Sequence, residues 1–202
     1  MNFFLLLILS TFFHKINPKP FVPNDGIVIS YQLNAKHYIN TEKIYATRFK
    51  LFIEESRSVF MEDNLIKYFD LHNSTLSSQE KMNLRGTFDT PKFKFIVEKQ
   101  KSNYLFLDEH YVGRNIAYTQ PKMDAEGWNI QTDTVTITGL MCYKALRELG
   151  GRIWIAWFAP ELPFSDGPYK FSGLPGLIVR LESEDGDYKF SLTGIQKISD
   201  TL

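Results

Sequence analysis

The sequence has a single cysteine, Cys142, among its 202 residues. One thiol cannot form an intramolecular disulfide, so the stability of the fold must come from packing. Histidine is also scarce, and the four histidines, at positions 14, 37, 72 and 110, do not occur in pairs with metal-ligand spacing. This pattern argues against a zinc site. We therefore expect neither a metal nor another cofactor.

An excess of charge of either sign is missing as well. The chain carries 23 Lys and Arg against 23 Asp and Glu. A balanced chain has no long-range attraction for phosphate or for an anionic membrane, and no cluster of basic residues is interleaved with aromatics. Gly176 precedes Leu177, Ile178 and Val179 rather than the Lys and Ser or Thr of a phosphate-binding loop. Nucleic acid is thus excluded as an expected partner.

The chain also lacks an apolar run long enough to cross a membrane. Residues 3–13 are mostly apolar, but a helix of that length spans only about 16 Å, roughly half of the hydrocarbon layer. We interpret residues 1–17 as a signal peptide-like leader and residues 18–26 as a proline-rich linker. The alternative for the apolar run is a buried N-terminal strand. The leader predicts an exported protein, periplasmic or secreted, with no transmembrane span after leader removal.

Aromatic residues are abundant, at 15% of the chain. They occur in short runs that alternate like β-strands, such as "GIVISYQLNAK", "ATRFKLFIEE" and "KFKFIVEKQ". The polar stretch "LHNSTLSSQEKMNLRG" is expected to be a surface loop that can include one helical turn. We predict that residues 27–202 form a single, mainly β domain: one curved antiparallel sheet or half-barrel with few short helices. A two-sheet β-sandwich is the alternative.

The second half of the chain predicts a series of hairpins. Gly139 interrupts an alternating strand and suggests a bulge or bend. Leu140–Leu149 fits either a short helix ended by Gly150 or a strand that turns at Gly150-Gly151 into "RIWIAWF", and we favour the hairpin. Because "RIWIAWF" is apolar on both faces, we expect a central strand that is covered on both sides.

The stretch "GPYKFSGLPGLIVRL", residues 167–181, combines glycines and prolines with bulky apolar residues. Leu174–Leu177 fits a type II turn, with Pro175 at its second position and Gly176 at its third. Tyr169 and Phe171 are expected to share one side of a short extended piece. We interpret the stretch as a tight corner between strands, packed under aromatic side chains.

Several motifs in this half resemble the signature of the GLPGLI family of exported Bacteroidetes-type proteins. The matching positions are Gly139, Cys142, Lys144, Ala145, Gly151, Arg152, Ala156, Trp157, Phe158, Glu161, Leu162, Pro163, Gly167, Pro168, Gly173, Leu174, Pro175, Gly176, Leu177 and Ile178. The resemblance covers about a quarter of the chain. It implies export and β architecture, and it assigns no catalysis because the family has no established activity. The chain stops at Leu202, soon after these motifs, so the domain is expected to be C-terminally short.

Two groups of residues are candidates for chemistry. Cys142 and Lys144 point to the same side of a strand, and a nearby ammonium group favours a thiolate. Without a neighbouring histidine base, however, a small buried thiol is the favoured interpretation. Arg152 and Glu161 are expected to form a structural ion pair across a hairpin, and Glu161 with Asp166 is a less favoured acid–base pair. We therefore assign no catalytic residue.

A dense group of aromatic residues is the candidate binding surface, with core packing as the favoured alternative. It consists of Trp154, Trp157, Phe158, Phe164, Tyr169 and Phe171. Together with the leader, it favours a non-enzymatic exported binding module for an apolar ligand or an extended peptide. A cell-envelope interaction module, whose protein partner docks on a sheet edge or on the 160–176 loop, is the alternative. A thiol-dependent enzyme is a weaker one.

Overall fold

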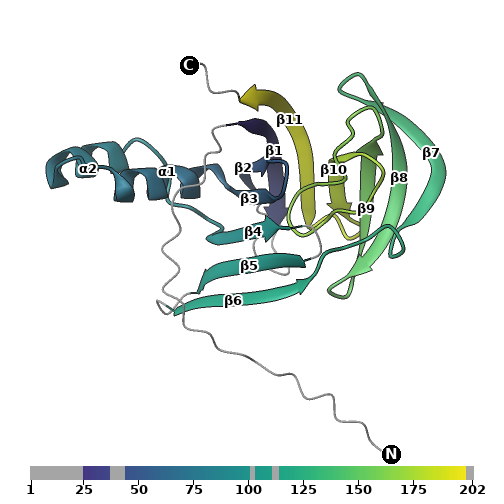
Figure 1. The fold of residues 1–202 in the computed structure, drawn as a ribbon, viewed down its shortest axis with the longest axis horizontal. Coiled ribbons are helices and arrows are strands. Elements are labelled where there is room, and N and C mark those ends of the chain that lie inside the picture. The colour runs from purple at the N-terminus through teal and green to yellow at the C-terminus, as the bar shows by residue number, and fades with distance from the viewer. Residues whose placement is uncertain (1–24, 37–43, 101–102, 111–113, 199–202) are drawn as a thin grey trace, which may run out of the picture.

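The computed structural model describes residues 25–36, 44–100, 103–110 and 114–198, so the expected leader and most of the expected linker lie outside the described residues. The described strands form one antiparallel sheet in the order β6-β5-β4-β3-β2-β1-β11-β10-β9-β8-β7 (Figure 1). The strands are β1 Gly26–Lys36, β2 Ile44–Ile53, β3 Ser58–Glu62, β4 Phe95–Lys99, β5 Asn103–His110, β6 Arg114–Pro121, β7 Asn129–Ile137, β8 Leu140–Leu149, β9 Arg152–Ala159, β10 Leu177–Ser183 and β11 Tyr188–Ile198. The predicted single curved sheet is confirmed, and the sandwich alternative is wrong.

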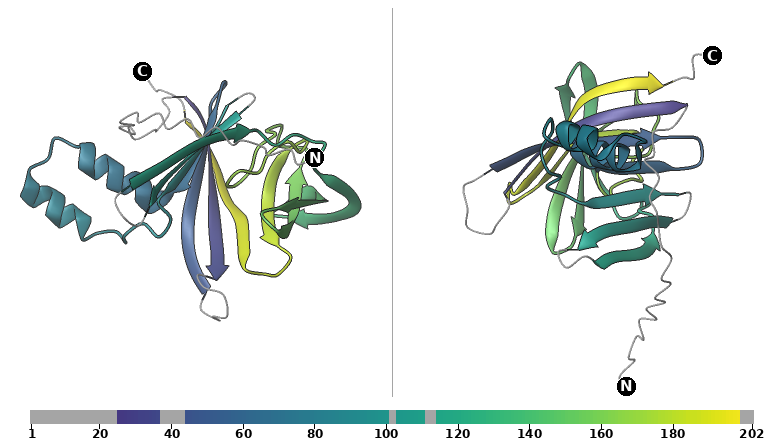
Figure 2. Two further views of the ribbon diagram at one scale, coloured as in Figure 1. Left: turned by 90° about the horizontal axis from the view of Figure 1, so that it is seen from below. Right: turned by 90° about the vertical axis from the view of Figure 1, so that its left-hand side faces the viewer.

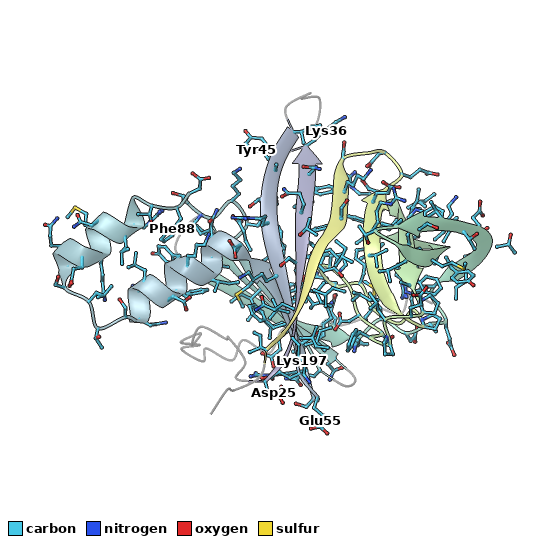
Figure 3. All side chains as sticks on the ribbon, turned by 90° about the horizontal axis from the view of Figure 1, so that it is seen from above. Asp25, Lys36, Tyr45, Glu55, Phe88 and Lys197 are labelled. Atoms are coloured by element: carbon cyan, nitrogen blue, oxygen red, sulfur yellow. The ribbon has the colours of Figure 1, made fainter. Side chains whose placement is uncertain are left out.

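The sheet consists of two meanders joined at its centre. Strands β1 to β6 lead outward in one direction, while β7 to β11 lead back from the opposite edge until β11 pairs with β1. The long central strands span the sheet, with Lys36 and Tyr45 at one end and Asp25, Glu55 and Lys197 at the other (Figure 3). Strands β6 and β7 follow one another in the chain but occupy opposite edges. Because the sheet is strongly bent (Figure 2), the short connection 122–128 suffices to join them.

The main core lies on the inner face of this bend. Alternation in β1 places Ile29, Tyr31 and Leu33 there, and Phe49 and Phe60 stack from the neighbouring strands with ring centroids 4.8 Å apart. The second meander, strands β7 to β11, contributes a further set of buried residues, Ala145, Trp154, Ala156, Phe158 and Leu181. The two meanders, called below the two arms of the sheet, therefore bury their apolar faces against a common interior.

The polar stretch expected to be a loop instead holds most of a helical arm, so that prediction is wrong. Helix α1, Asp63–Asn73, packs Leu65 and Ile66 on the outer face of the sheet, and α2, Ser78–Arg85, has no buried residue. The arm projects away from the sheet (Figures 1 and 2). Ser77 and Glu80 form a capping box at the N-terminus of α2, and their spacing in the sequence is typical of a helix start. Among the described residues, no helix has the length and apolar character needed to span a bilayer.

The glycines of the second meander make turns between strands. Gly150 and Gly151 have φ of 62° and 73° and connect β8 to β9, which confirms the predicted hairpin and excludes a helix over Leu140–Leu149. Gly139 is not a bulge within a strand. It forms a two-residue turn with Thr138, both with positive φ, and reverses the chain from β7 to β8.

Strand β9 is covered fully on one face only. Trp154, Ala156 and Phe158 face the core, whereas Ile153 is 43% exposed on the other face. The expectation of complete burial on both sides is therefore wrong. Helix α1 covers the outer face near β2 and β3, far from β9 in the strand order.

Candidate functional site

The segment between β9 and β10, residues 160–176, is called here the signature segment. It folds back between the two arms of the sheet, where Phe171 and Leu174 are fully buried. Its chain closes on itself, because the amide of Leu177 donates to the carbonyl of Leu162 at 3.0 Å and the amide of Ile178 donates to that of Asp166 at 3.0 Å. The side chains of the signature segment thus fill part of the interior of the bent sheet.

The local geometry of the signature segment differs from the prediction. The amide of Gly176 donates to the carbonyl of Leu174 at 2.8 Å, two residues back, so the turn is centred on Pro175 and is not type II. Tyr169, with φ of 54°, lies in a turn closed by a hydrogen bond from Phe171 to Pro168, so it is not in an extended piece. The first difference arises because the amide of Leu177 pairs with the carbonyl of Leu162 rather than with that of Leu174.

A buried ionic cluster holds the signature segment to the first meander. Lys99 of β4 forms an ion pair with Asp166 and donates to the carbonyls of Gly167 at 2.5 Å and Phe171 at 3.2 Å. Ser58 of β3 donates to the second carboxylate oxygen of Asp166 at 2.5 Å, and the Gly167 amide donates to the first at 2.7 Å. The Lys99 side chain has no exposed surface. Every charge in the cluster is thereby compensated within the protein.

The electrostatics of the cluster follow from its burial. Burial lowers the pKa of Lys99, and the carboxylate of Asp166 acts in the opposite direction. The pKa of Tyr31 is raised, first by burial and then by the charge of Asp166, and its hydroxyl donates to the carbonyl of Ile178 at 2.7 Å. All these groups are buried, and Lys99 and Ser58 both bond to Asp166, while Tyr31 bonds to the backbone of Ile178. Their arrangement is that of a structural anchor.

The connection between the sheet edges forms a second anchor. The indole nitrogen of Trp128 donates to the carbonyl of Ser172 at 2.8 Å, and the Ser172 hydroxyl donates to the carbonyl of Met123 at 3.1 Å. The ring of Phe171 lies between Trp154 and Trp128, with centroid distances of 4.9 and 5.9 Å. The signature segment is thus fixed to both arms and to the connection between the sheet edges.

The six aromatic residues of the candidate binding surface fall into two groups. Trp154, Phe158 and Phe171 are core residues. Trp157, Phe164 and Tyr169 are partly buried and pack against the core. Trp157 lies on the outer face of β9, where the guanidinium of Arg180 stands 5.6 Å from its ring. Only the second group retains surface that a ligand could reach.

The expected ion pair between Arg152 and Glu161 is wrong. Arg152 pairs instead with Asp185 and, at 2.9 Å, with Asp187. The strand order explains this result, because Arg152 starts β9 beside the β10–β11 turn, whereas Glu161 follows the other end of β9. Glu161 accepts a hydrogen bond from the amide of Met141 at 3.4 Å. Asp166 belongs to the buried cluster, which leaves no acid–base pair with Glu161.

Cys142 is buried in β8, and its thiol donates to the carbonyl of Leu140 at 3.4 Å. Burial raises the pKa of the thiol, with opposing smaller effects of the Ile137 backbone and Arg180. The protonated thiol is therefore the dominant form near neutral pH. In the described ranges, no group of three or more His, Cys, Asp and Glu is placed to hold a metal ion.

Cys142 is expected to react with a disulfide reagent at least about 100-fold more slowly in the folded protein than in urea, because reaction requires opening of β8 and deprotonation. The rate would be followed by absorbance between pH 6 and 9. Rapid labelling that increases through neutral pH would instead indicate an accessible thiolate. That result would support the alternative of a thiol-dependent enzyme.

Sequence reasoning missed the partners of the signature segment. Lys99 and Ser58 lie 67 and 108 residues from Asp166 along the chain, and local patterns give no access to such contacts. One weak signal existed. Lys99 shares a strand face with the buried Val97, where a solvent-facing lysine would be out of place.

Comparison with known proteins gives a short family match. Residues 151–180, from the start of β9 to the middle of β10, match a family described as "Protein of unknown function (Porph_ging)", which is associated with Bacteroidetes. Among curated proteins, none is similar to this chain in sequence. The match covers β9, the signature segment and the first half of β10.

Solved structures show a related fold. Two structures of PNGF-II, in space groups P21 and C2, superimpose with TM-scores of 0.59 and 0.60 at 13% identity, covering 88% of this chain but only 29% and 28% of the PNGF-II chain. This chain thus spans less than a third of PNGF-II, and the similarity concerns the fold alone. The LolA superfamily protein NE2245 from Nitrosomonas europaea, at 8% identity, covers 90% of this chain and 89% of its own with a TM-score of 0.33, too low to support an argument.

Proposed function

We propose that this protein is an exported, non-enzymatic binding module of the GLPGLI family that pairs with an extended peptide segment of an envelope partner along the free edge of β7. The observation that carries the proposal is the position of β7 at the end of the strand order, where β8 is its one partner among the described strands (Figure 1). Export is supported by the leader-like residues 1–17 and by the match to residues 151–180.

The filled interior favours an edge over an internal pocket. An apolar ligand bound inside the bend would have to displace Phe171, Leu174 and Ile178, which are fully buried, and break the anchor at Asp166. Displacing well-packed side chains of this size is costly. An extended peptide on an edge strand requires no such displacement, since it bonds to backbone groups that are already free.

The geometry of the hairpin identifies the free backbone groups. Ile137 pairs with Leu140 across the two-residue turn, and in such hairpins the pair next to the turn exchanges both backbone hydrogen bonds. The backbone N–H and C=O groups of Val135, which pairs with Cys142, point toward β8 in the same way. The N–H and C=O groups of Thr134 and Thr136 therefore point outward. The regular pairing is interrupted between Ile130 and Thr134, so we place the docking strand at residues 134–137.

Thr136→Pro is expected to weaken binding of edge-docked peptides at least about tenfold, because it removes an outward N–H without removing a bond to β8. Peptides would be selected from a random phage-displayed library on the intact protein, and their affinities would be measured by calorimetry. Thr136→Ala, which keeps the N–H, is the matched control and should bind like the wild type. Amide exchange at Thr134 and Thr136 should slow when peptide binds. Selected peptides that bind Thr136→Pro normally and leave both amides unprotected would contradict the proposal.

A further inference from the structure

The outer face of the second meander carries a row of three side chains that the signature segment does not use. In the strand register, Trp157 of β9 lies directly opposite Lys144 of β8 on one side and Arg180 of β10 on the other. Directly opposite residues in antiparallel strands share a face, so the indole lies between two basic side chains. All three are partly exposed. Lys144 and Trp157 also belong to the motifs singled out in the sequence.

The two cations differ from most other basic residues of the sheet in having no acidic partner. Lys189 pairs with Glu182 at 3.6 Å and Lys36 pairs with Asp187 at 3.9 Å, and Arg152 is paired as described above. Within the residues the structure describes, the side chains of Lys144 and Arg180 make neither an ion pair nor a hydrogen bond. The row therefore presents uncompensated positive charge.

Arg180 contacts the indole of Trp157. Its guanidinium carbon lies 5.6 Å from the centre of the Trp157 ring, within the range of a cation–π contact. Among the described residues its Nε is buried without a hydrogen-bond partner, whereas the side chain as a whole is partly exposed. A guanidinium can bind a carboxylate through its two terminal nitrogens, and Nε is not needed for that contact.

Two acidic residues near the row, Glu182 and Glu161, have other partners. Glu182 of the same face is engaged by Lys189. Glu161, whose charge, like that of Arg180, affects the thiol of Cys142, accepts a bond from the Met141 amide and forms no ion pair with Arg180 within the described ranges. The charge complementarity of the row is therefore available to a partner.

We propose that Lys144, Trp157 and Arg180 form a binding site for an acidic peptide segment, in which a carboxylate pairs with Arg180 and an adjacent part of the peptide packs on the indole. Neighbouring strands lie about 4.8 Å apart, so the two cations start roughly 10 Å apart and can both reach a ligand above Trp157. The site lies on a face of the sheet, with Trp157 two strands in from β7, and it does not depend on docking at the β7 edge.

The test uses capped hexaglutamate as the probe and capped hexaglutamine as its uncharged control, added to the full chain and followed by NMR. The indole N–H of Trp157 reports on the site, because those of Trp128 and Trp154 are bonded to the carbonyls of Ser172 and Leu149 in the interior. Hexaglutamate should shift the Trp157 signal, and hexaglutamine should not. No shift of this signal with hexaglutamate, or an equal shift with inorganic phosphate, would overturn the proposal.

Variants separate the site from a general charge effect. Arg180→Gln should weaken hexaglutamate binding at least about tenfold, and Arg180→Lys should do so partially, because lysine keeps the charge but lacks the planar fork. Lys197→Gln removes a positive charge from an exposed position of β11 outside the site and should leave the affinity unchanged. Equal weakening by Lys197→Gln and Arg180→Gln would contradict a defined site. A normal melting temperature of each variant establishes that it is folded.

Discussion

Replacement of Lys99 by methionine is expected to lower the free energy of unfolding by about 3–5 kcal/mol. The substitution keeps the length and apolar stem of the side chain but leaves the carboxylate of Asp166 buried with only Ser58 and the Gly167 amide as donors. It also removes the donor to the carbonyls of Gly167 and Phe171. Urea unfolding followed by tryptophan fluorescence would measure the loss.

Two controls make this result specific. Lys197→Met, at an exposed position of β11, should change the free energy of unfolding by no more than about 0.5 kcal/mol. Asp166→Asn combined with Lys99→Met should be less destabilising than the sum of the single changes, because the two residues are in direct contact. Additive effects, or a loss below about 1 kcal/mol for Lys99→Met, would show that the ion pair does not anchor the signature segment.

Gly176→Ala is expected to destabilise the protein by about 2–4 kcal/mol. Gly176 has φ of 151°, which side-chain-bearing residues rarely adopt, and an added Cβ would lie 2.4 Å from the carbonyl oxygen of Ala159. The obstacle is backbone at the end of β9, so a rotamer change cannot relieve it. The amide of Gly176 would also lose its bond to Leu174 if the chain moved. The melting temperature and the urea midpoint would both fall.

Gly194→Ala is the matched control for this change. Gly194 lies in β11, and an added Cβ there would meet no atom within 4 Å. Alanine in a strand is slightly favoured over glycine, so the variant should be as stable as the wild type or more so by about 0.5 kcal/mol. If both alanine variants were equally stable, the close contact between Gly176 and Ala159 would not exist in solution.

Local patterns were sufficient to predict much of the fold. Alternation in "GIVISYQLNAK" predicted β1, and the pair Gly150-Gly151 predicted the turn between β8 and β9, because both depend on neighbouring residues alone. The error at Gly139 is also local, since a glycine in an alternating run fits either a bulge or a two-residue turn. Helix α1 was missed because its apolar face is narrow, with only Leu65 and Ile66 buried among its apolar residues.

The arrangement around the signature segment could not be predicted, because it depends on contacts between distant parts of the chain. A pair of Asp166 with Glu161 was only a less favoured hypothesis, and no local pattern indicated that Asp166 pairs with Lys99 of β4, in the other half of the sheet. Arg152 was expected to pair with Glu161, but the β10–β11 turn brings Asp185 and Asp187 closer. In both cases the sequence contains the correct charges, and the strand order decides which of them meet.

Amide hydrogen exchange of the native protein at Leu177 and Ile178 tests the central claim most directly. These amides donate to Leu162 and Asp166 inside the folded segment, so they should exchange only with global unfolding, at rates like those of the slowest amides of β1. Exchange at these two positions that is faster by several orders of magnitude, while β1 stays protected, would mean that the signature segment opens independently of the rest of the sheet. The interior of the sheet would then be accessible, and an apolar ligand inside the bend would replace the peptide at its edge.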